Sequence, residues 1–537
     1  MRPSKLRSAL RVADQRGQAI VLTALLLPSL MGFMGLVVDI AWFQLNLVRI
    51  QRAADAAALA GTVYLPGNVS GAQTAALAAA QQNGFVAGTG GVSIAASQDA
   101  GNLNQLDVSI SSPVRTWFMR IFGIDSITAT RNARAEFILP LPMGSPQSYF
   151  GVHYLCRDSD TPPACPAIPS ASGVGTDPSQ GFWTAIEAKG TDHQSGDAYS
   201  TFYDSIAGAN SPIYDPAGYS YIVSFPPGTT NGKVYLFDPI FCATGAGTGT
   251  GRRLGTGDFW LTSTHPGITT RFKLWDTNGT PYTTADDILL YDSGALFANI
   301  DAVDKSADYS GNLDYGGGYD GSSSADCSVA PLNAYHNVWW QLPSAALTGT
   351  QYRLQVYTSD GTTNENAVNN FSIEATGNVA GIQVYGQTRM CTFNAISGSS
   401  IFYLAQVAAV HAGKTLEIKV FDPGDISSTS LKVEMPTTTG YVDATFSWSA
   451  TGCWGGCATS GSNVTALQSS DRFTNFFNDQ WVTIDVVLPT NYSAPTPPGE
   501  PGPGWWKIEY VTPGNGQDVA TWQVTIRGNP VHLVTPQ

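Results

Sequence analysis

Oxygen-bearing side chains are concentrated between residues 276 and 333, in a pattern that suits cation binding. The acidic residues of this stretch are Asp276, Asp286, Asp287, Asp292, Asp301, Asp304, Asp308, Asp314, Asp320 and Asp326. Asp and Asn at alternate loop positions are ligands that Ca²⁺ accepts. The EF-hand spacing is absent, because Thr280 occupies the fifth loop position and no Glu closes the loop. Asp and Asn also form ordinary turns, so calcium binding and turn formation both stay open, here and at Asp422-Pro-Gly-Asp425.

No catalytic constellation is visible in the sequence. The histidines lie scattered at positions 153, 193, 265, 336, 411 and 532. The chain contains no H-E-x-x-H, G-x-S-x-G or P-loop motif. We therefore expect a protein that is not an enzyme, and we assign no catalytic, cofactor-binding or metal-binding residue. Calcium is the one cofactor that the acidic stretch allows.

The seven cysteines predict disulfides in an oxidising compartment. They lie at positions 156, 165, 242, 327, 391, 453 and 457. We predict local bridges Cys156–Cys165 and Cys453–Cys457, a longer bridge Cys242–Cys327, and a free Cys391. Metal binding by the C-x-x-x-C pair is the alternative, but no second Cys or His pair lies near it.

Two tryptophan pairs, Trp339-Trp340 and Trp505-Trp506, are candidates for stacking on sugars. Neighbouring residues of a strand point to opposite faces of the sheet. One member of each pair is therefore expected in a core, which is the usual place for such large side chains.

These residues are positioned by a chain that begins with a membrane segment. Gln18 to Val38 contains no charged residue, and about 20 apolar residues in a helix span a bilayer. The run is longer than the apolar region of a secretory signal, and no A-x-A cleavage site follows it. We predict a basic leader over 1–17 and an uncleaved transmembrane helix over 18–42, kinked at Pro28. Asp39 is expected at headgroup level.

The charge of the chain is divided between its two ends. Residues 1–52 carry seven basic and two acidic side chains, which gives them a net charge of +5. The net charge of the whole chain is −14, so residues 53–537 carry a net charge of −19. The positive-inside rule then predicts a cytoplasmic N-terminus and an extracytoplasmic bulk, anchored in the cytoplasmic (inner) membrane. An acidic ectodomain argues against nucleic acid as a partner.

A small α+β module follows the span. The run from Leu47 to Ala60 is rich in helix formers, and Gly61 is expected to end the helix. A second helix is predicted near 72–83, strands near 92–96, 106–111 and 127–138, and a short helix near 114–122. The module is assigned to residues 43–140.

Three segments of the N-terminal region carry a family resemblance: Arg16-Gly17-Gln-Ala-Ile-Val, Gly35-Leu-Val-Val-Asp39 and Gln51-Arg-Ala-Ala-Asp-Ala-Ala-Ala-Leu-Ala-Gly61. Together they resemble the N-terminus of TadE/TadG-like proteins of Flp pilus assembly, the tight-adherence system. The resemblance covers about residues 14–62 and extends loosely to 140. It implies a pilin-like long helix on a small sheet. TadE-type pseudopilins carry a Glu five residues after the processed Gly, where this chain has Leu22. The segment is therefore more similar to a TadG-type anchor.

The rest of the chain predicts two tandem β-sandwiches of jelly-roll or Ig-like type. Short alternating runs are separated by Gly, Pro, Asn and Asp clusters. Gly232-Lys-Val-Tyr-Leu-Phe-Asp-Pro239 and Gly413-Lys-Thr-Leu-Glu-Ile-Lys-Val-Phe-Asp-Pro423 belong to an internal repeat whose blocks keep their order. The predicted boundaries are 141–218 for an irregular connector, 219–388 for copy one with the insertion 276–333, and 396–537 for copy two.

Two functions fit these features. The first is a single-pass surface protein of the Flp pilus-assembly type, which presents β-sandwiches for structural or adhesive interaction with other pilus-assembly proteins or surfaces. The alternative is a carbohydrate-binding cell-surface protein that is not tied to a pilus and binds cell-surface glycans.

Overall fold

The computed structural model describes residues 6–151, 182–237, 241–243, 258–260, 268–282, 284–298, 339–397, 399–425, 427–513, 515–528 and 531–535. The chain divides into two compact units. The helical unit comprises residues 1–139 and 529–537, and the sandwich unit comprises residues 140–528. The predicted fold class, a long helix with a small sheet followed by an all-β region, is confirmed.

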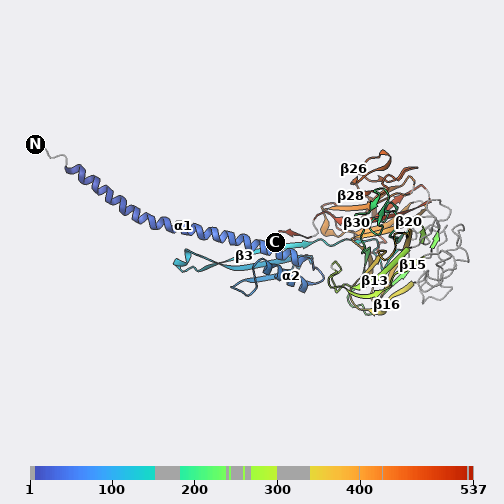
Figure 1. The fold of residues 1–537 in the computed structure, drawn as a ribbon, viewed down its shortest axis with the longest axis horizontal. Helices are drawn as coiled ribbons and strands as arrows, with labels where there is room; N and C mark the ends of the chain where they lie inside the picture. Colours follow the sequence, from blue (N-terminus) through green and yellow to red (C-terminus); the bar gives the residue numbers. More distant parts are fainter. Residues whose placement is uncertain are drawn as a thin grey trace. The chain divides into compact units, whose positions relative to one another are not determined.

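One helix, α1 (Leu6–Thr62), runs through the whole N-terminal region. It passes Pro28 without interruption, and Figure 1 shows it as a gently curved rod where a kink is predicted from the sequence. The second helix, α2 (Val69–Gln82), begins at Asn68, whose side chain accepts a hydrogen bond from the N–H of Gly71 at 2.7 Å. Such a cap satisfies one of the free N–H groups at the helix start.

A four-stranded antiparallel sheet packs against these helices. Its order is β1 (Ser93–Gln98), β2 (Gln105–Arg115), β3 (Ser126–Phe137) and β31 (Val531–Val534). The short 3₁₀-helix η1 (Met119–Phe122) lies between β2 and β3. The first three strands confirm the sequence prediction. The short helix predicted near 114–122 is present only at 119–122, because residues 114 and 115 belong to β2. The fourth strand comes from the C-terminus of the chain, which the sequence places in a sandwich.

Small side chains form the core of the helical unit. The fully buried alanines of the two helices are Ala53, Ala54, Ala57, Ala58, Ala72, Ala76 and Ala80. They pack on Leu106, Val108 and Ile110 of β2. Gly61 lies inside α1, one residue before its end, and a Cβ there would lie 2.6 Å from the carbonyl oxygen of Ala72. Its role is therefore close helix packing, where the sequence predicts a helix stop.

The sandwich unit contains two large sheets among its described residues. The first has the order β11 (Phe241–Ala243), β12 (Asp258–Trp260), β18 (Ala367–Thr376), β6 (Phe182–Glu187), β20 (Arg389–Ser397), β30 (Asn515–Ile526), β22 (Thr415–Phe421), β28 (Trp481–Val487), β25 (Phe446–Ala450) and β26 (Ser460–Val464). Beside this path, β10 (Gly232–Phe237) pairs with β18 and β16 (Trp339–Leu347), and β5 (Tyr149–Phe150) pairs with β18.

The second sheet has the order β14 (Ile288–Asp292), β13 (Ile268–Asp276), β17 (Gln351–Tyr357), β9 (Tyr219–Ser224), β19 (Gln383–Gln387), β4 (Pro142–Met143), β21 (Ser400–Gln406), β29 (Trp505–Val511), β23 (Ser430–Thr437) and β24 (Gly440–Asp443). Beside this path lie β15 (Leu296–Ala298) on β13 and β27 (Leu467–Gln468) on β23. A separate small ribbon is formed by β7 (Tyr203–Asp204) and β8 (Ala209–Asn210).

The two large sheets pack face to face through aromatic side chains. Phe371 of β18 contacts both Tyr221 of β9 and Phe272 of β13, with ring centroids 5.8 and 5.6 Å apart. Further along, Trp522 of β30 contacts Phe402 of β21 at 5.4 Å. Sheets stacked about 10 Å apart need such large side chains to fill the space between them. The unit is therefore a β-sandwich.

The internal repeat is visible in the strand pairing. In copy one, β9 pairs with β17, and β10 pairs with both β16 and β18. In copy two, β21 pairs with β29, and β22 pairs with both β28 and β30. The five strands named in each copy thus have counterparts with corresponding partners in the other. Both copies lie in the same two sheets, joined by β6 and β20 in one sheet and by β19 and β4 in the other.

The segment that the sequence predicts as an irregular connector contributes strands to these sheets. β6 lies between β18 and β20, so it forms part of the connection between the two copies. Its sequence, Phe-Trp-Thr-Ala-Ile-Glu, is short and flanked by Gly and Ser, so it resembles a loop when read alone. Pairing on both edges stabilises it as a strand.

Candidate functional site

The apolar part of α1 exposes its side chains on all sides. The exposed fractions are 58% for Leu22, 55% for Leu27 and 68% for Phe33. An apolar surface of this extent is unfavourable in water and is the surface that a helix presents to lipid. The helix is also long and apolar enough to cross a membrane, and it fits a single-pass anchor.

Asp39 lies where this apolar surface ends, and its side chain is buried. Its carboxylate accepts backbone N–H hydrogen bonds from Trp117, Phe118 and Met119 at 2.8, 2.9 and 2.7 Å. Both carboxylate oxygens are therefore engaged with the start of η1. Asp39 fastens the β2–β3 connection to α1, a role that the expected headgroup location does not include. The partners lie 78 to 80 positions away, so no local signal could identify them.

The polar residues of the Gln51–Gly61 segment also hold the helix on its sheet. The side-chain amide of Gln51 donates to Asp55 Oδ1 at 2.8 Å and to the carbonyl of Asn132 in β3 at 3.1 Å. Trp42 and Phe43 are half-buried against the same alanine-rich core. The segment that carries the family resemblance is thus the surface on which the helical unit is assembled.

Asp422 and Asp518 are two buried acidic residues of the sandwich unit. Asp518 Oδ1 accepts the N–H groups of Gly424 and Asp425 at 3.2 and 3.1 Å, so it shapes the turn after β22. Asp422 Oδ1 accepts the N–H of Asp479 at 3.1 Å. The second oxygen of Asp422 has no hydrogen-bond partner in the described part of the chain, whereas Asp518 also interacts with the Tyr510 side chain.

Burial without such partners disfavours the charged form of a carboxylate. Burial raises the pKa of Asp518 to about 6. Burial, together with the neighbouring Asp425 and Asp518, raises the pKa of Asp422 well above its ordinary value. The Asp-Pro-Gly-Asp sequence is therefore a turn whose first acid, Asp422, is buried, while Asp425 is exposed.

Two other groups bring possible metal ligands together among the described residues: His193, Asp204 and Asp479; and Glu434, Asp443 and Glu509. In the first, His193 Nδ1 lies 2.6 Å from Asp479 Oδ1, and Nε2 lies 3.3 Å from the carbonyl oxygen of Ala198. Both ring nitrogens therefore face oxygen acceptors, and a nitrogen that donates has no lone pair for a metal.

The second group lies on β23, β24 and β29 and contains a lysine. Lys432 Nζ lies 3.0 Å from Glu509 and 3.5 Å from Asp443. A cation is thus already supplied by the chain. Neither group gives a geometry that favours a bound metal over the internal contacts.

Part of the acidic insertion 276–333 is described, and its side chains engage protein groups. Asp292 forms a bidentate pair with Arg271 at 2.6 and 2.7 Å, which lowers the pKa of Asp292 to about 2. Asp287 pairs with Arg353. Thr280 Oγ1 donates to Asp286 Oδ1 at 2.8 Å. These carboxylates support the β13–β14 hairpin, and Asp301 to Asp326 lie outside the described residues.

The tryptophan pair 505–506 is buried on both sides of its strand, so the core position expected for one member holds for both residues. The Nε1–H of Trp506 donates to the Tyr492 hydroxyl at 3.0 Å. This pair presents no sugar-stacking face. The side chains of Trp339 and Trp340 lie outside the described residues.

One predicted disulfide and the predicted free thiol are present. Cys453 and Cys457 are bridged, and Cys391 is free and fully buried in β20. Burial raises the pKa of the Cys391 thiol well above its ordinary value, which makes it a structural side chain. The pairings predicted for Cys156, Cys165, Cys242 and Cys327 involve side chains outside the described residues.

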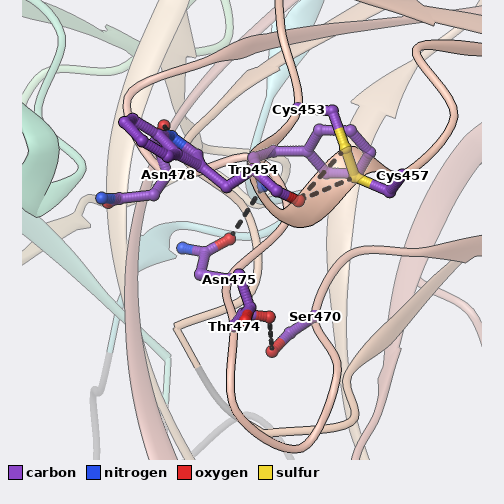
Figure 2. Close-up of a disulfide and its surroundings, with 8 residues drawn as sticks. Cys453, Trp454, Cys457, Ser470, Thr474, Asn475 and Asn478 are labelled. Carbon is purple, nitrogen blue, oxygen red and sulfur yellow. Dashed lines mark hydrogen bonds between the residues drawn. A yellow bond between two sulfur atoms is a disulfide. The ribbon is translucent and has the colours of Figure 1, made fainter.

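The bridged loop presents an aromatic side chain of the sandwich unit to solvent. Figure 2 shows Trp454 between the two bridged cysteines, beside the loop that contains Ser470 and Thr474. The Nε1–H of Trp454 donates to the carbonyl of Asn478 at 2.7 Å, and its backbone N–H donates to the carbonyl of Phe476 at 2.8 Å. Trp454 is 43% exposed and Phe473, on the neighbouring loop, is 84% exposed. Two exposed aromatic side chains on a crosslinked surface are suited to contact with a partner.

Residues 17–63 match the Tad family, described as "Putative Flp pilus-assembly TadE/G-like". This range covers the apolar span, Asp39 and the alanine-rich half of α1. No curated protein matches the chain. The match and the exposed apolar helix together support a membrane-anchored, pilus-related protein.

Proposed function

We propose that this Tad-type protein is an extracytoplasmic surface component that presents its β-sandwich for structural or adhesive contact during pilus assembly or attachment. The match at residues 17–63 and the lipid-type surface of α1 support the anchor. The basic residues before the span favour a cytoplasmic N-terminus. The sandwich then lies outside the cytoplasm, where a disulfide such as Cys453–Cys457 is stable.

The observation that carries this proposal is the position of the sandwich unit in the chain. Residues 140–528 are inserted between β3 and β31, which are antiparallel neighbours in the sheet of the helical unit. The sandwich is therefore linked to the helical unit at both ends. A domain that is attached to the anchor module at both of its ends suits presentation outside the membrane.

We propose a binding role without catalysis. In the described part of the sandwich unit, the two groups of possible metal ligands make internal contacts: His193 contacts Asp479, and Lys432 contacts Glu509. The exposed side chains of this part include the aromatic residues Trp454 and Phe473. A binding surface needs such side chains, whereas hydrolysis needs a positioned acid, base or nucleophile.

The test uses the adjacency of β3 and β31. In the native host, residues 140–528 are replaced by a short Asn-Gly turn that joins the two strands, because such turns connect antiparallel neighbours. This variant, which keeps only the helical unit, is expected to remain in the membrane fraction, and the cells are expected to lose surface attachment. Piliation and adhesion at wild-type levels in a host that carries only this variant would refute the proposal.

A second candidate function, carbohydrate binding, is favoured by Trp454 among the described tryptophans. Its indole is partly exposed and is held by a hydrogen bond to Asn478. A fixed, exposed indole is a common platform for stacking, as in other aromatic recognition surfaces. Glycan-array binding by the wild type, abolished in Trp454→Ala and retained in Val487→Ala, would favour this function over a pilus-associated role.

A further inference from the structure

The turn between β2 and β3, residues 116–125, carries an apolar surface that the proposed function does not explain. We call this segment the hairpin tip. Its exposed apolar side chains are Trp117, Phe118, Ile121, Phe122 and Ile124. Ile121 is 77% exposed and Phe122 is 82% exposed. Five large apolar side chains within eight positions form a contiguous patch, which soluble surfaces rarely show unless it has a partner.

The hairpin tip is an ordered structure. The Thr116 N–H donates to the carbonyl of Asp125 at 3.1 Å, and the Thr116 hydroxyl donates to the carbonyl of Ile124. Gly123 closes η1 with a φ of 81°, a conformation that glycine adopts without strain. The outward direction of Ile121 and Phe122 therefore results from a defined fold.

Two contacts attach the hairpin tip to the end of the apolar span. Asp39 accepts three N–H groups from residues 117–119, as described above. Gly35, one turn earlier in α1, faces the ring of Phe118, and a Cβ on Gly35 would lie 2.7 Å from it. Figure 1 shows the β2–β3 hairpin running back along α1, toward the N-terminal end of the helix. The tip thus lies beside the last turn of the span.

This position determines the partner. Around the contact, Met31, Met34 and Val38 of α1 are exposed, and they belong to the apolar span. The apolar surface of the hairpin tip continues the surface that faces lipid. Arg115 and Arg120 are also exposed at the tip, and long basic side chains at this depth reach the headgroups while their stems stay in the apolar layer. Trp117 suits the same boundary.

We propose that the hairpin tip inserts into the boundary between lipid headgroups and acyl chains, beside the span, as a second membrane contact of the helical unit. The inference rests on the membrane anchor of the proposed function. Two contacts on one side of α1 fix the rotation of the helix about its axis and hold β2 and β3 at a defined height above the bilayer. A single span would leave this rotation free.

The test is photocrosslinking in the full chain. p-Benzoylphenylalanine replaces Phe122 in the protein reconstituted into vesicles of phosphatidylethanolamine and phosphatidylglycerol, and adducts are identified by mass spectrometry. Phe473 is a matched control, because it is also a phenylalanine and is 84% exposed, but in the sandwich unit. The analogue resembles Phe and sits on an exposed position, so folding is preserved.

We expect phospholipid adducts at position 122 at least tenfold more abundant than at position 473. A third probe replaces Leu27, in the middle of the span. It distinguishes failure of the hairpin-tip insertion from failure of the membrane anchor. Lipid adducts at 27 with none at 122, or only protein adducts at 122, would overturn the insertion and leave the anchor intact. Absence of lipid adducts at 27 would overturn the anchor itself.

Discussion

The two units of this protein build their cores from opposite kinds of side chain. The helical unit buries alanines at the contact of α1, α2 and a sheet, whereas the sandwich unit buries Trp183, Trp505, Trp506 and Trp522. Small side chains allow helices to approach closely, but they bury little area each. Large aromatic side chains fill the space between two sheets and bury 150–250 Å² each, roughly. The helical unit therefore depends on close fit, and the sandwich on the size of its side chains.

The units also treat buried carboxylates differently. Asp39 in the helical unit has three N–H donors for its two oxygens. Asp422 in the sandwich unit has one oxygen without a partner in the described residues, and the neighbouring Asp518 is a second buried carboxyl. The first arrangement stabilises the charged form, and the second destabilises it. The following predictions test both contrasts, from the largest effect to the smallest.

Removal of a central sandwich aromatic should have the largest effect. Trp522 is fully buried, contacts Phe402, and donates its Nε1–H to Thr392 Oγ1 at 3.1 Å. Trp522→Ala should reduce the stability of the sandwich unit by about 3–5 kcal/mol, because it leaves a large cavity. Hydrogen exchange resolved by peptide should show the loss in residues 140–528 only. Trp454→Ala, at a partly exposed position, is the control and should change hydrogen exchange little. Equal increases in exchange for the two variants would contradict the idea that the sandwich core depends on its large side chains.

The pH dependence of the sandwich unit should come from its buried acids. The pKa of Asp518 is raised to about 6 in the fold from 3.8, so the folded state binds more protons between pH 4 and 6. The unfolding free energy should therefore fall as the pH rises through this window, by up to about 3 kcal/mol. The raised pKa of Asp422 contributes with the same sign.

Asp518→Asn keeps an oxygen for the N–H groups of Gly424 and Asp425 but removes the ionisable group. Denaturant midpoints measured from pH 4 to 7 should then show a smaller slope than in the wild type. Parallel curves for the two proteins would show that Asp518 does not contribute.

Close packing in the helical unit should be sensitive to a single methyl group. Gly61→Ala places a Cβ against the Ala72 carbonyl and the Leu106 side chain, and we expect a loss of about 1–2 kcal/mol. Gly32→Ala is the control, because a Cβ there meets nothing within 4 Å. Thermal unfolding of the detergent-solubilised chain distinguishes them. A stable Gly61→Ala protein would show that α1 and α2 can separate without cost.

The contact made by Asp39 should have the most local effect. Asp39→Ala leaves the N–H groups of Trp117, Phe118 and Met119 without this acceptor. Their amide exchange should accelerate at least tenfold while the strands of the sheet stay protected. Asp55→Ala, which removes only the acceptor of the Gln51 amide on the same helix, should leave the tip unchanged. No acceleration in Asp39→Ala would contradict the fastening role.

Much of the helical unit is predictable from sequence because its signals are local. Each of these signals arises from residues that are close together in the sequence. They are the uncharged run from Gln18 to Val38, the helix-forming residues up to Ala60 and the alternating patterns of the strands. The Cys453–Cys457 bridge is predictable for the same reason, since only three residues separate the cysteines. The repeat is visible because its blocks keep their order.

Other features depend on partners distant in sequence. β31 pairs with β3 across nearly 400 residues, and β6 pairs with β18 and β20. The candidate surfaces show the same limit. In the sequence, Trp505 and Trp506 fit a sugar-stacking surface as well as a hydrophobic core. Only the packing of the folded chain shows that both side chains are buried.

The sequence by itself determined that the chain has a helix long and apolar enough to cross a membrane, an α+β module and a repeated β region, because hydrophobic period and length are properties of consecutive residues. Only the tertiary structure decided that Asp39 fastens a hairpin tip to the span, that the C-terminus completes the first sheet, and that the two repeats share their sheets. Each of these depends on hydrogen bonds or packing between segments far apart in the chain, and such partners are selected by the whole fold.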